Sequence, residues 1–558
     1  MGQEKEDTVT VARTPIVADF ETTTTPDDCR VWFWATATVS LTPEIDYCND
    51  LDLFFEYVLS NPYDCYFHNL AFDGSFILNW LLRHDYTYVV EKPRPGQFTA
   101  VIDKSNKFYT ITVNSRKGTV TRFLDSLKLI PMPVRAIPAA FGLDEMKGDI
   151  DYDAPRPVGY QPTDEEVDYI MHDVSIVARA LCMQQSEGIT KTTIGSSALS
   201  IYKEKMSQGL FAKLFPPLLD GVDKQLRKAY KGGFTYAAEK FRGKVVGPIS
   251  TYDVNSLYPY VMYTRPLPYG EPTMRYGDLP DEGLWIARVV VQGSVKPEHI
   301  PCIQIKSSFR FSPTEYVTVI DEPVELWVTS VDWALWNDQY DLDVLEIGEV
   351  YVFDSASGIF TNYIDHYMEI KKKSTGGKRT IAKLMLNSLY GKFGTNPDAT
   401  RKVPSLDDEG ALKLRLGDQE EKATIYVPLA AFVTAWARDV TIRSAQSNFD
   451  TFAYADTDSM HLVGDGEPVG IRVDSAELGA WKLEGRWDDG LYAHAKCYTE
   501  RLGDCFESHV AGMPADMADR VRYEHYLTDT VFHGKLVPRQ VPGGVVLEKR
   551  DFTLKGVS

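Results

Sequence analysis

A short acidic segment, Tyr-Ala-Asp456-Thr-Asp458-Ser, constrains the fold of this chain more than any other feature. It separates two apolar stretches, 451–454 and 460–463, and so predicts two strands joined by a tight turn. Asp and Ser favour turns because their side chains hydrogen-bond nearby backbone. Carboxylate oxygens are also the ligands that Mg²⁺ prefers. Taken alone, an exposed acidic turn explains the segment as well as a metal site does.

A third carboxylate, Asp253, lies near the end of another predicted strand, in Thr-Tyr-Asp253-Val-Asn-Ser-Leu-Tyr-Pro. With Asp458, and with Asp456 in support, it could hold two cations about 4 Å apart. Such a pair activates a 3′-hydroxyl and neutralises the charge of a transferring phosphoryl group. The three carboxylates therefore indicate nucleotidyl transfer.

A helix is predicted from residue 380 onward, because the segment lacks Pro and is rich in helix formers. Lys383, Asn387 and Tyr390 are spaced i, i+4 and i+7, so they share one face, while Leu and Met side chains occupy the rest. A lysine binds a triphosphate as a point charge, and the Tyr390 ring could support a base pair by stacking. A solvated face of an amphipathic helix is the alternative.

The amino-terminal part carries a second group of acids. Asp19 and Glu21 share one face of a predicted strand. Asp73 follows an aromatic run, and Tyr169 and Asp173 are spaced i, i+4 on a predicted helix. Four acids and a tyrosine indicate a second metal site, at which one ion lowers the pKa of an attacking water and another stabilises a leaving 3′-oxygen. Tyr169 could orient that water, so phosphodiester hydrolysis is the expected chemistry.

In their order along the chain, these segments resemble the motifs of a known family. The segments that begin at Asp253, Lys383 and Tyr454, followed by Lys496-Cys-Tyr498, look like motifs A, B, C and the Lys-x-Tyr motif of family B DNA polymerases. The protein-primed branch is the most similar, with Tyr230-Lys-Gly-Gly-Phe and a C-terminal Gln-Val-Pro-Gly-Gly-Val-Val-Leu. The amino-terminal acids resemble the ExoI, ExoII and ExoIII motifs of 3′-5′ proofreading exonucleases.

The resemblance implies a bacteriophage DNA-templated DNA polymerase that is protein-primed, displaces the downstream strand and carries a 3′-5′ exonuclease. It implies Mg²⁺, with Mn²⁺ as a substitute, at two ions per active site. The expected partners are template and primer DNA, deoxynucleoside triphosphates, a terminal priming protein and a viral single-stranded-DNA-binding protein. We expect a monomer in the host cytoplasm, with no membrane association.

Two other functions stay open. One is a family B polymerase that extends nucleic-acid primers with accessory factors, which the short chain and its two insertions disfavour. The other is a DNA-binding scaffold with degenerate catalytic motifs, which the intact acids at both sites disfavour.

The resemblance also implies roles for single residues. Metal-binding positions are Asp253, Val254, Asp458, Asp19, Glu21, Asp73 and Asp173, with Asp456, Tyr169 and Lys147 as further catalytic positions. The nucleotide site comprises Tyr258, Lys371, Arg379, Lys383, Asn387 and Tyr390, and Tyr258 would exclude a 2′-hydroxyl. DNA contacts fall to His68, Asn69, Phe72, Ser126, Leu127, Tyr230, Lys231, Gly232, Gly233, Phe234, Thr434, Arg438, Lys496 and Tyr498.

Some of these assignments have a purely structural alternative. Ser126 and Leu127 could simply end a strand, and Lys147 could be a surface charge. Thr434 and Arg438 could belong to a helix that buries a Trp.

We expect an α/β multidomain fold, with an RNase H-like 3′-5′ exonuclease domain before a right-hand polymerase domain of palm, fingers and thumb that carries two inserted subdomains. The exonuclease domain would span 1–190, and a linker with the first part of the palm 191–269. The remaining expected parts are the first inserted subdomain (terminal-protein region 1) at 270–360, fingers at 361–397, an exposed inserted hairpin (terminal-protein region 2) at 398–420, palm at 421–530 and the end of the thumb at 531–558.

Composition limits how the chain could bind nucleic acid. Its formal net charge is −20, so binding would depend on local basic tracks such as Lys371-Lys-Lys373 and 535–539. Seven cysteines without a Cys-x-x-Cys pair support neither a zinc ribbon nor a disulfide framework. The acidic start lacks an apolar stretch, so secretion is not expected.

Overall fold

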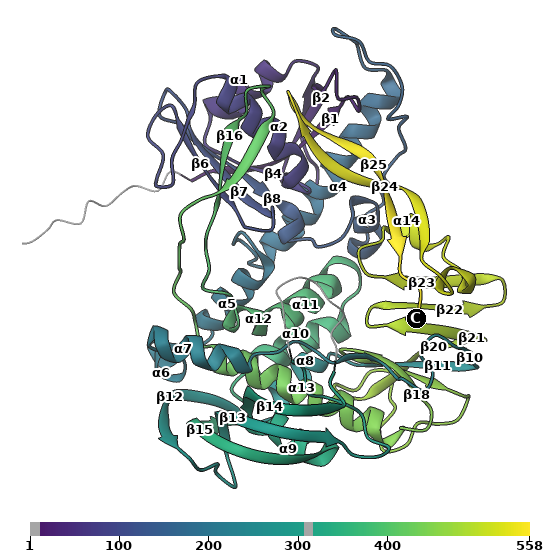
Figure 1. Ribbon diagram of the computed structural model, residues 1–558. Coiled ribbons are helices and arrows are strands. Elements are labelled where there is room, and N and C mark those ends of the chain that lie inside the picture. The colour runs from purple at the N-terminus through teal and green to yellow at the C-terminus, as the bar shows by residue number, and fades with distance from the viewer. Residues whose placement is uncertain (1–11, 306–315, 558) are drawn as a thin grey trace, which may run out of the picture.

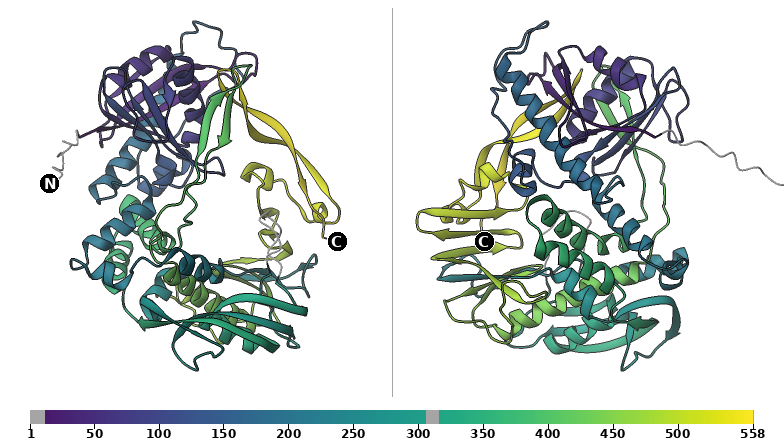
Figure 2. Two further views of the ribbon diagram at one scale, coloured as in Figure 1. Left: turned by 60° about the vertical axis from the view of Figure 1, so that its left-hand side comes forward. Right: turned by 180° about the vertical axis from the view of Figure 1, so that it is seen from behind.

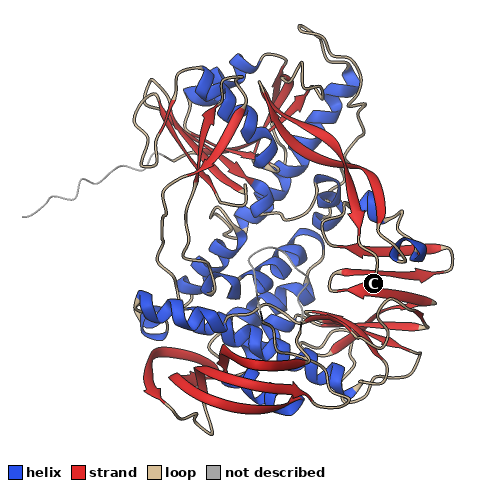
Figure 3. Cartoon of the chain, viewed as in Figure 1, coloured by secondary structure: helices blue, strands red, loops and turns tan. Residues whose placement is uncertain are grey.

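The computed structural model describes residues 12–305 and 316–557. Figure 1 shows an N-terminal body at the top and a larger body below it, which long hairpins connect. Both bodies combine sheets with covering helices, as the colouring by secondary structure in Figure 3 makes plain. The views from two further sides in Figure 2 show the same division. The expected α/β class is therefore present in both bodies.

The N-terminal body is built on one eight-stranded sheet. Helices α1 (Leu51–Ser60) and α2 (Leu70–Arg83) share one core with Ile16, Ala18 and Phe20 of β1, whereas Val17 shares the other core with α4 (Asp164–Ser186). Because side chains alternate along a strand, Asp19 and Glu21 point to the α4 side. The strands in spatial order are β3 (Ile45–Cys48), β2 (Val31–Thr38), β1 (Thr14–Thr22), β4 (Tyr63–Phe67), β8 (Val120–Asp125), β7 (Phe108–Asn114), β6 (Gln97–Ile102) and β5 (Thr87–Tyr88).

A second, antiparallel sheet, here called the central sheet, organises the lower body. The apolar helix α13 (Val427–Ser447) contacts β18 and β19, and it packs against α8 (Leu257–Thr264). Most of the α13 side chains are buried, which is typical of a helix surrounded by other elements. The strands in spatial order are β20 (Trp481–Trp487), β11 (Ile249–Val254), β19 (Ser459–Val463), β18 (Phe452–Asp456) and β9 (Thr235–Ala237).

The segment between the two parts of the central sheet forms a sheet of its own at the bottom of Figure 1. Its helix α9 (Ser330–Gln339) packs on α13 and so joins this lower sheet to the rest of the body. The strands in spatial order are β12 (Leu267–Tyr276), β15 (Tyr340–Ala356), β13 (Leu284–Val295) and β14 (Val319–Thr329).

Helices fill the space between the sheets. Three follow the lower sheet, and these are α10 (Thr361–Lys373), α11 (Gly376–Ser388) and α12 (Tyr390–Phe393). The shorter connecting helices are η1 (Ser126–Lys128), η2 (Val134–Ala136), α3 (Ile137–Phe141), α5 (Ile194–Glu204), α6 (Leu210–Leu214), α7 (Asp220–Leu226) and η3 (Arg227–Ala229).

The C-terminal part forms a small sheet and then a long hairpin, which runs up to the N-terminal body (Figure 1). The hairpin tip fits closely there, since a Cβ on Gly543 would lie 2.1 Å from the Cys29 carbonyl oxygen, and one on Gly544 would lie 2.2 Å from the Phe76 ring. The elements are β10 (Val245–Val246), β21 (Asp489–His494), β22 (Cys497–Leu502) and β23 (Cys505–Val510) in the small sheet, then α14 (Ala515–Ala518), η4 (Tyr523–Tyr526) and the hairpin β24 (Thr530–Val541) with β25 (Gly544–Leu554).

The hairpin predicted at 398–420 is present as β16 (Lys402–Leu406) and β17 (Leu412–Leu416), but it is not simply exposed. Leu412 is buried in the core of the N-terminal body, and Lys104 pairs with Asp398 at 2.8 Å. The expectation of an exposed hairpin is therefore wrong in part, because Leu412 and the partly buried Leu414 dock it on the N-terminal body together with this ion pair.

The local predictions at the motifs are confirmed in part: the acidic turn and the helix at Lys383 and Asn387 are present, but that helix ends at Ser388, so Tyr390 lies on the separate helix α12. The acidic turn joins β18 to β19, with Thr457 in the left-handed region at φ +62°. The helix that carries Lys383 and Asn387 is α11, on which both side chains are exposed. None of the helices in the two described ranges combines the length and apolar character needed to cross a membrane.

Candidate active sites

The central sheet brings Asp253 and Asp458 together. Asp253 of β11 lies opposite Ser459 of β19 in the ladder, and the Val254 amide donates to the Asp458 carbonyl at 2.8 Å. Two carboxylates from distant parts of the chain thus lie side by side, Asp253 on β11 and Asp458 in the turn directly before β19. The tight turn at Thr457 is what places Asp458 there.

The electrostatics of this pair fit a cation. Burial, and then the charge of Asp458, raise the pKa of Asp253 to about 7. Burial and Asp456 raise the pKa of Asp458, while Lys383 and Lys496 oppose the shift. A raised pKa means that the surroundings do not stabilise the ionised carboxylate. A divalent cation, which prefers oxygen ligands, would supply the missing positive charge.

Cationic side chains gather beside these carboxylates. Lys371 of α10 donates to the Ser256 hydroxyl at 2.9 Å, and Arg379 of α11 donates to the Lys371 carbonyl at 2.7 Å. Burial lowers the pKa of Lys371, and the nearby charges of Lys383 and Arg379 lower it further. Three positive groups close to two acids are suited to hold a triphosphate.

Two tyrosines accompany this cationic group. The rings of Tyr258 and Tyr390 stack with centroids 4.2 Å apart, one from α8 and the other from α12. The structure therefore places on one side of the central sheet the aromatic pair and the cations that the sequence assigned to one nucleotide site.

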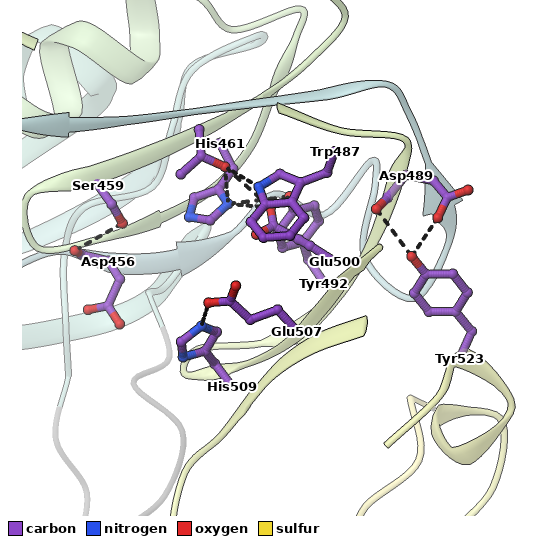
Figure 4. Close-up of polar contacts among 11 residues, drawn as sticks. Asp456, Ser459, His461, Trp487, Asp489, Tyr492, Glu500, Glu507, His509 and Tyr523 are labelled. Atoms are coloured by element: carbon purple, nitrogen blue, oxygen red, sulfur yellow. Dashed lines mark hydrogen bonds and ion pairs between the residues drawn. The ribbon is translucent and has the colours of Figure 1, made fainter. Parts of the chain in front are cut away.

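Asp456 has a different environment from Asp458. Its carboxylate accepts from Lys496 Nζ at 2.7 and 2.8 Å and from the Thr235 hydroxyl at 3.0 Å. The Lys496 amide in turn donates to the Tyr454 hydroxyl at 2.9 Å. In Figure 4 the Asp456 side chain points away from the Ser459 hydroxyl, which bonds the Asp456 backbone. Asp456 thus anchors Lys496, which agrees with a supporting role.

The N-terminal acids also converge. Asp19 and Glu21 of β1, Asp73 in the first turn of α2, and Asp173 of α4 face a common space. Burial and mutual repulsion raise the pKa of Asp19 to about 7, and burial raises the pKa values of the other three. The alternation of β1 puts Asp19 and Glu21 on one face, and the packing of α2 and α4 around β1 brings Asp73 and Asp173 to them.

Lys147 and Tyr169 complete this cluster. Lys147 Nζ lies 2.5 Å from Asp173 Oδ2, and Asp173 Oδ1 is buried without a hydrogen-bond partner. The Tyr169 hydroxyl bonds that of Tyr152 at 2.8 Å, and burial and the Asp173 charge keep its pKa raised. A buried carboxylate oxygen with no donor is the kind of group that a cation would satisfy.

These acids line an open cleft of about 1750 Å³. The opposite walls come from the two hairpins that reach the N-terminal body, and their side chains there include Lys402, Lys413, Arg539, Lys549 and Arg550. His68, Asn69 and Phe72 lie on the N-terminal side. A cleft with acids at one wall and cations at the other can admit a strand whose phosphates face the cations.

Neither cluster is a complete metal cage on its own. Among the described residues, no three His, Cys, Asp or Glu side chains converge tightly enough to enclose an ion. The raised pKa values and the unpaired Asp173 oxygen nevertheless fit hard cations, for which substrate oxygens and water commonly supply further ligands.

Comparison with known proteins assigns the chain to a family. The family model described as DNA polymerase type B, organellar and viral, matches residues 57–161 and 155–475. The chain belongs to the type B DNA polymerases. Bacteriophage enzymes are similar to this polymerase over nearly its whole length. Identity is 40% to the DNA polymerase of Bacillus phage Nf, over 98% of this chain and 100% of that one, and 32% to that of Streptococcus phage Cp-1, over 96% and 98%.

Solved structures agree. Phi29 DNA polymerase complexed with primer-template DNA superposes on this type B polymerase with a TM-score of 0.92 at 39% identity, covering 98% of this chain and 100% of that one. The same enzyme complexed with primer-template DNA and incoming nucleotides, or with single-stranded DNA, gives the same score.

The structure of this polymerase revises part of the predicted DNA contact set. Thr434, Arg438, Phe234 and Ser126 are buried. Arg438 forms a buried ion pair with Asp332 at 2.7 Å and also donates to the Lys231 and Gly232 carbonyls. Direct side-chain contact with DNA is therefore not available to these four residues, and each is better described as a positioning residue.

The segment 230–234 contacts the acidic turn between β18 and β19. The Phe234 carbonyl accepts from the Thr457 amide at 2.6 Å, and a Cβ on Gly233 would lie 2.7 Å from the Thr457 side chain. The Tyr230 ring packs as closely against Gly394. The Tyr-Lys-Gly-Gly-Phe segment thus supports the acidic turn from behind. Lys231 lies over the Trp336 ring, with its Nζ 4.8 Å from the centroid.

Sequence reasoning missed several residues of both sites. Tyr152 bonds Tyr169, and nothing in its spacing indicated this. Lys482 of β20 pairs with Asp253 in the ladder and lowers its pKa, whereas Glu484 of the same strand raises it. Asp125 accepts from the amides of Asn69 and Leu127 at 3.1 and 3.0 Å, and its position directly before Ser126 was the only available signal.

Proposed function

We propose that this chain is a protein-primed, strand-displacing DNA polymerase with a 3′-5′ proofreading exonuclease, which replicates linear viral DNA. One observation supports this proposal most directly: a chain that is similar to phage DNA polymerases over nearly its whole length holds two separate carboxylate clusters with raised pKa values on two different sheets. One cluster faces gathered cations and an aromatic pair, and the other lines an open cleft.

In the polymerase site, Asp253 and Asp458 would hold two Mg²⁺ ions, with Val254 beside them and Asp456 in support. Lys371, Arg379 and Lys383 bind the triphosphate, and Tyr258, Asn387 and Tyr390 line the nucleotide pocket. Lys496 and Tyr498 hold the primer strand. Bound ions would supply the positive charge that activates the primer 3′-hydroxyl and offsets the charge on the phosphoryl group.

In the exonuclease site, Asp19, Glu21, Asp73 and Asp173 are the metal-binding residues. Tyr169 orients the attacking water, and Lys147 holds Asp173 in place. His68, Asn69, Phe72 and Leu127 receive the single-stranded primer end at the cleft, with Ser126 and Asp125 fixing the loops that carry them.

The domain layout follows from these assignments. The N-terminal body is the exonuclease domain, and the central sheet and the small sheet form the palm, with helices α10 to α12 as fingers and the long hairpin as the end of the thumb. The lower sheet and the β16–β17 hairpin are the two inserted subdomains, which would contact the terminal protein and the DNA during strand displacement.

The test is extension of a singly primed circular single-stranded template with Mg²⁺ and no accessory protein, read on a denaturing gel. Asp458→Asn should abolish extension but keep degradation of single-stranded DNA, whereas Asp73→Asn should do the reverse. Each change replaces a carboxylate by an amide of nearly the same shape. Because each variant leaves the other site unaltered, its remaining activity shows that the protein is folded.

The outcomes separate the parts of the proposal. Products of many template lengths support polymerisation with strand displacement, and products that stop at one template length contradict displacement. Absence of extension by the unaltered protein would overturn the polymerase assignment. Protein priming is tested with purified terminal protein and one labelled nucleotide, and failure to label that protein would contradict it.

A further inference from the structure

A buried hydrogen-bonded pair lies behind the acidic turn, outside the groups assigned to the chemistry. His461 Nδ1 lies 2.7 Å from Glu500 Oε1, and both residues are 3% exposed or less. The same carboxylate oxygen accepts from the Tyr492 hydroxyl at 2.6 Å. Figure 4 shows these three side chains grouped with Trp487 at the centre of the view.

The pair joins strands that no ladder connects. His461 is on β19, three residues after Asp458, and it pairs in register with Thr251 of the strand that carries Asp253. Glu500 is on β22, which belongs to the small sheet rather than to the central sheet. In the described part of the chain, β22 has no ladder with either of these two strands. The backbone connects them only indirectly, through β20, which pairs with β11 and continues after one residue as β21, which pairs with β22, so the side chains make the direct link.

The neighbouring side chains extend the link. Thr251 Oγ1 accepts from Trp487 Nε1 at 3.1 Å and lies 3.5 Å from Glu500 Oε1. The Tyr498 ring packs on His461 with centroids 5.2 Å apart and on Tyr454 at 4.7 Å. Tyr498 and Lys496 are the two residues expected to hold the primer strand, and Glu500 follows Tyr498 by two positions.

Chemistry fixes the direction of the hydrogen bonds. His461 and Tyr492 hold the pKa of Glu500 below its usual range against the effect of burial. The carboxylate is therefore ionised and can only accept, so His461 Nδ1 carries the proton. Removing one partner of a hydrogen bond buried in this way leaves the other polar group unsatisfied, so the pair strongly favours one relative placement of its two strands.

We propose that His461 and Glu500 are positioning residues that lock the strand carrying Tyr498, and Lys496 just before it, onto the two strands carrying Asp253 and Asp458. The inference rests on the proposed polymerase function and adds a specific task to it. The pair sets the distance between the primer-strand grip and the reacting carboxylates. Loss of the pair would then weaken productive primer binding more than it slows the chemical step.

The test compares three variants in steady-state primer extension. Glu500→Leu removes the acceptor at similar volume, and Glu500→Gln keeps an acceptor oxygen at the same place. Glu507 provides the matched control, because it bonds His509 at 3.0 Å on the next strand, yet that pair is more than half exposed (Figure 4). The His509 ring stacks on Tyr498 with centroids 4.8 Å apart, and this contact is retained when only Glu507 is replaced. Glu507→Leu therefore makes the same change at a solvated pair.

We expect Glu500→Leu to raise the KM for primer-template about tenfold, as for residues coupled in one network, with a smaller change in kcat. Glu500→Gln should restore KM to within about twofold, and Glu507→Leu should leave it unchanged. Degradation of single-stranded DNA by the distant N-terminal site reports that each variant is folded. If Glu500→Leu is not folded, Tyr492→Phe removes one donor and should raise KM about threefold.

Other results would overturn the inference. An unchanged KM in folded Glu500→Leu protein excludes the positioning role, as does an equal rise in Glu507→Leu. A fall in kcat and melting temperature with constant KM would mean that the pair serves stability alone. If the unaltered protein extends no primer, the proposed function fails instead, so the two failures are distinguishable.

Discussion

Single side chains decide the selectivity of the central-sheet site. The Tyr258 ring stacks on Tyr390, two residues after the Ser256 hydroxyl that Lys371 contacts. Replacing Tyr258 with Val should raise ribonucleotide incorporation about tenfold or more, because the smaller side chain no longer blocks a 2′-hydroxyl. Single-nucleotide incorporation of ribonucleotides and deoxyribonucleotides measures the ratio. Tyr258→Phe keeps the ring and should behave as the unaltered protein, and an unchanged ratio in the Val variant would exclude this role.

The raised pKa of Asp19 predicts how the stability of the protein depends on pH. Its pKa in the folded protein is about 7 instead of the usual 3.8, so between these values the folded state binds more protons than the unfolded state. Its contribution to the free energy of unfolding therefore falls as pH rises from about 4 to 7. In a chelator, Asp19→Asn should be more stable than the unaltered protein at pH 8, by up to a few kcal/mol, and closer to it at pH 5.

Thermal unfolding at the two pH values measures this difference. Adding Mg²⁺ should reduce the difference in stability between the two proteins at pH 8, because a bound cation offsets the charge of the Asp19 carboxylate. If the stability difference between Asp19→Asn and the unaltered protein were larger at pH 5 than at pH 8, the predicted direction of the pH dependence would be wrong.

At the scale of elements, the β16–β17 hairpin docks through Leu412, with Leu414 partly buried beside it. Leu412 is 1% exposed in the core of the N-terminal body, whereas Leu416 of the same strand is 62% exposed. Leu412→Ala should loosen the docked hairpin by about 2–5 kcal/mol, the usual cost of emptying a buried leucine site. Hydrogen exchange of residues 402–416 should become faster, while Leu416→Ala leaves it unchanged. Equal exchange in both variants would mean that the ion pairs around the hairpin hold it.

At the scale of the whole molecule, the long C-terminal hairpin closes on the N-terminal body. Gly543 has φ +98°, and a Cβ there would meet the Cys29 carbonyl oxygen, whereas Gly534 of the same hairpin has φ +97° and open space around it. Gly543→Ala should therefore undock the tip, and Gly534→Ala should cause similar backbone strain without undocking. Faster hydrogen exchange at 541–546 in the first variant alone is the expected result. Similar exchange in both would mean that the tip tolerates the added methyl group.

Local geometry was predictable from the sequence. The acidic turn between β18 and β19, the shared face of Lys383 and Asn387, and the i, i+4 pair Tyr169 and Asp173 each depend on spacing within one element. Backbone periodicity sets these relations, so residue order alone was sufficient.

Only the tertiary structure decided which of these faces meet. Arg438 is buried against Asp332, which lies 106 residues away in sequence. Lys496 pairs with Asp456, which lies 40 residues away. The docking of Leu412 and the His461–Glu500 link likewise join strands of different sheets. Such contacts depend on the packing of whole elements, and the short-range spacing of residues carries no information about their partners.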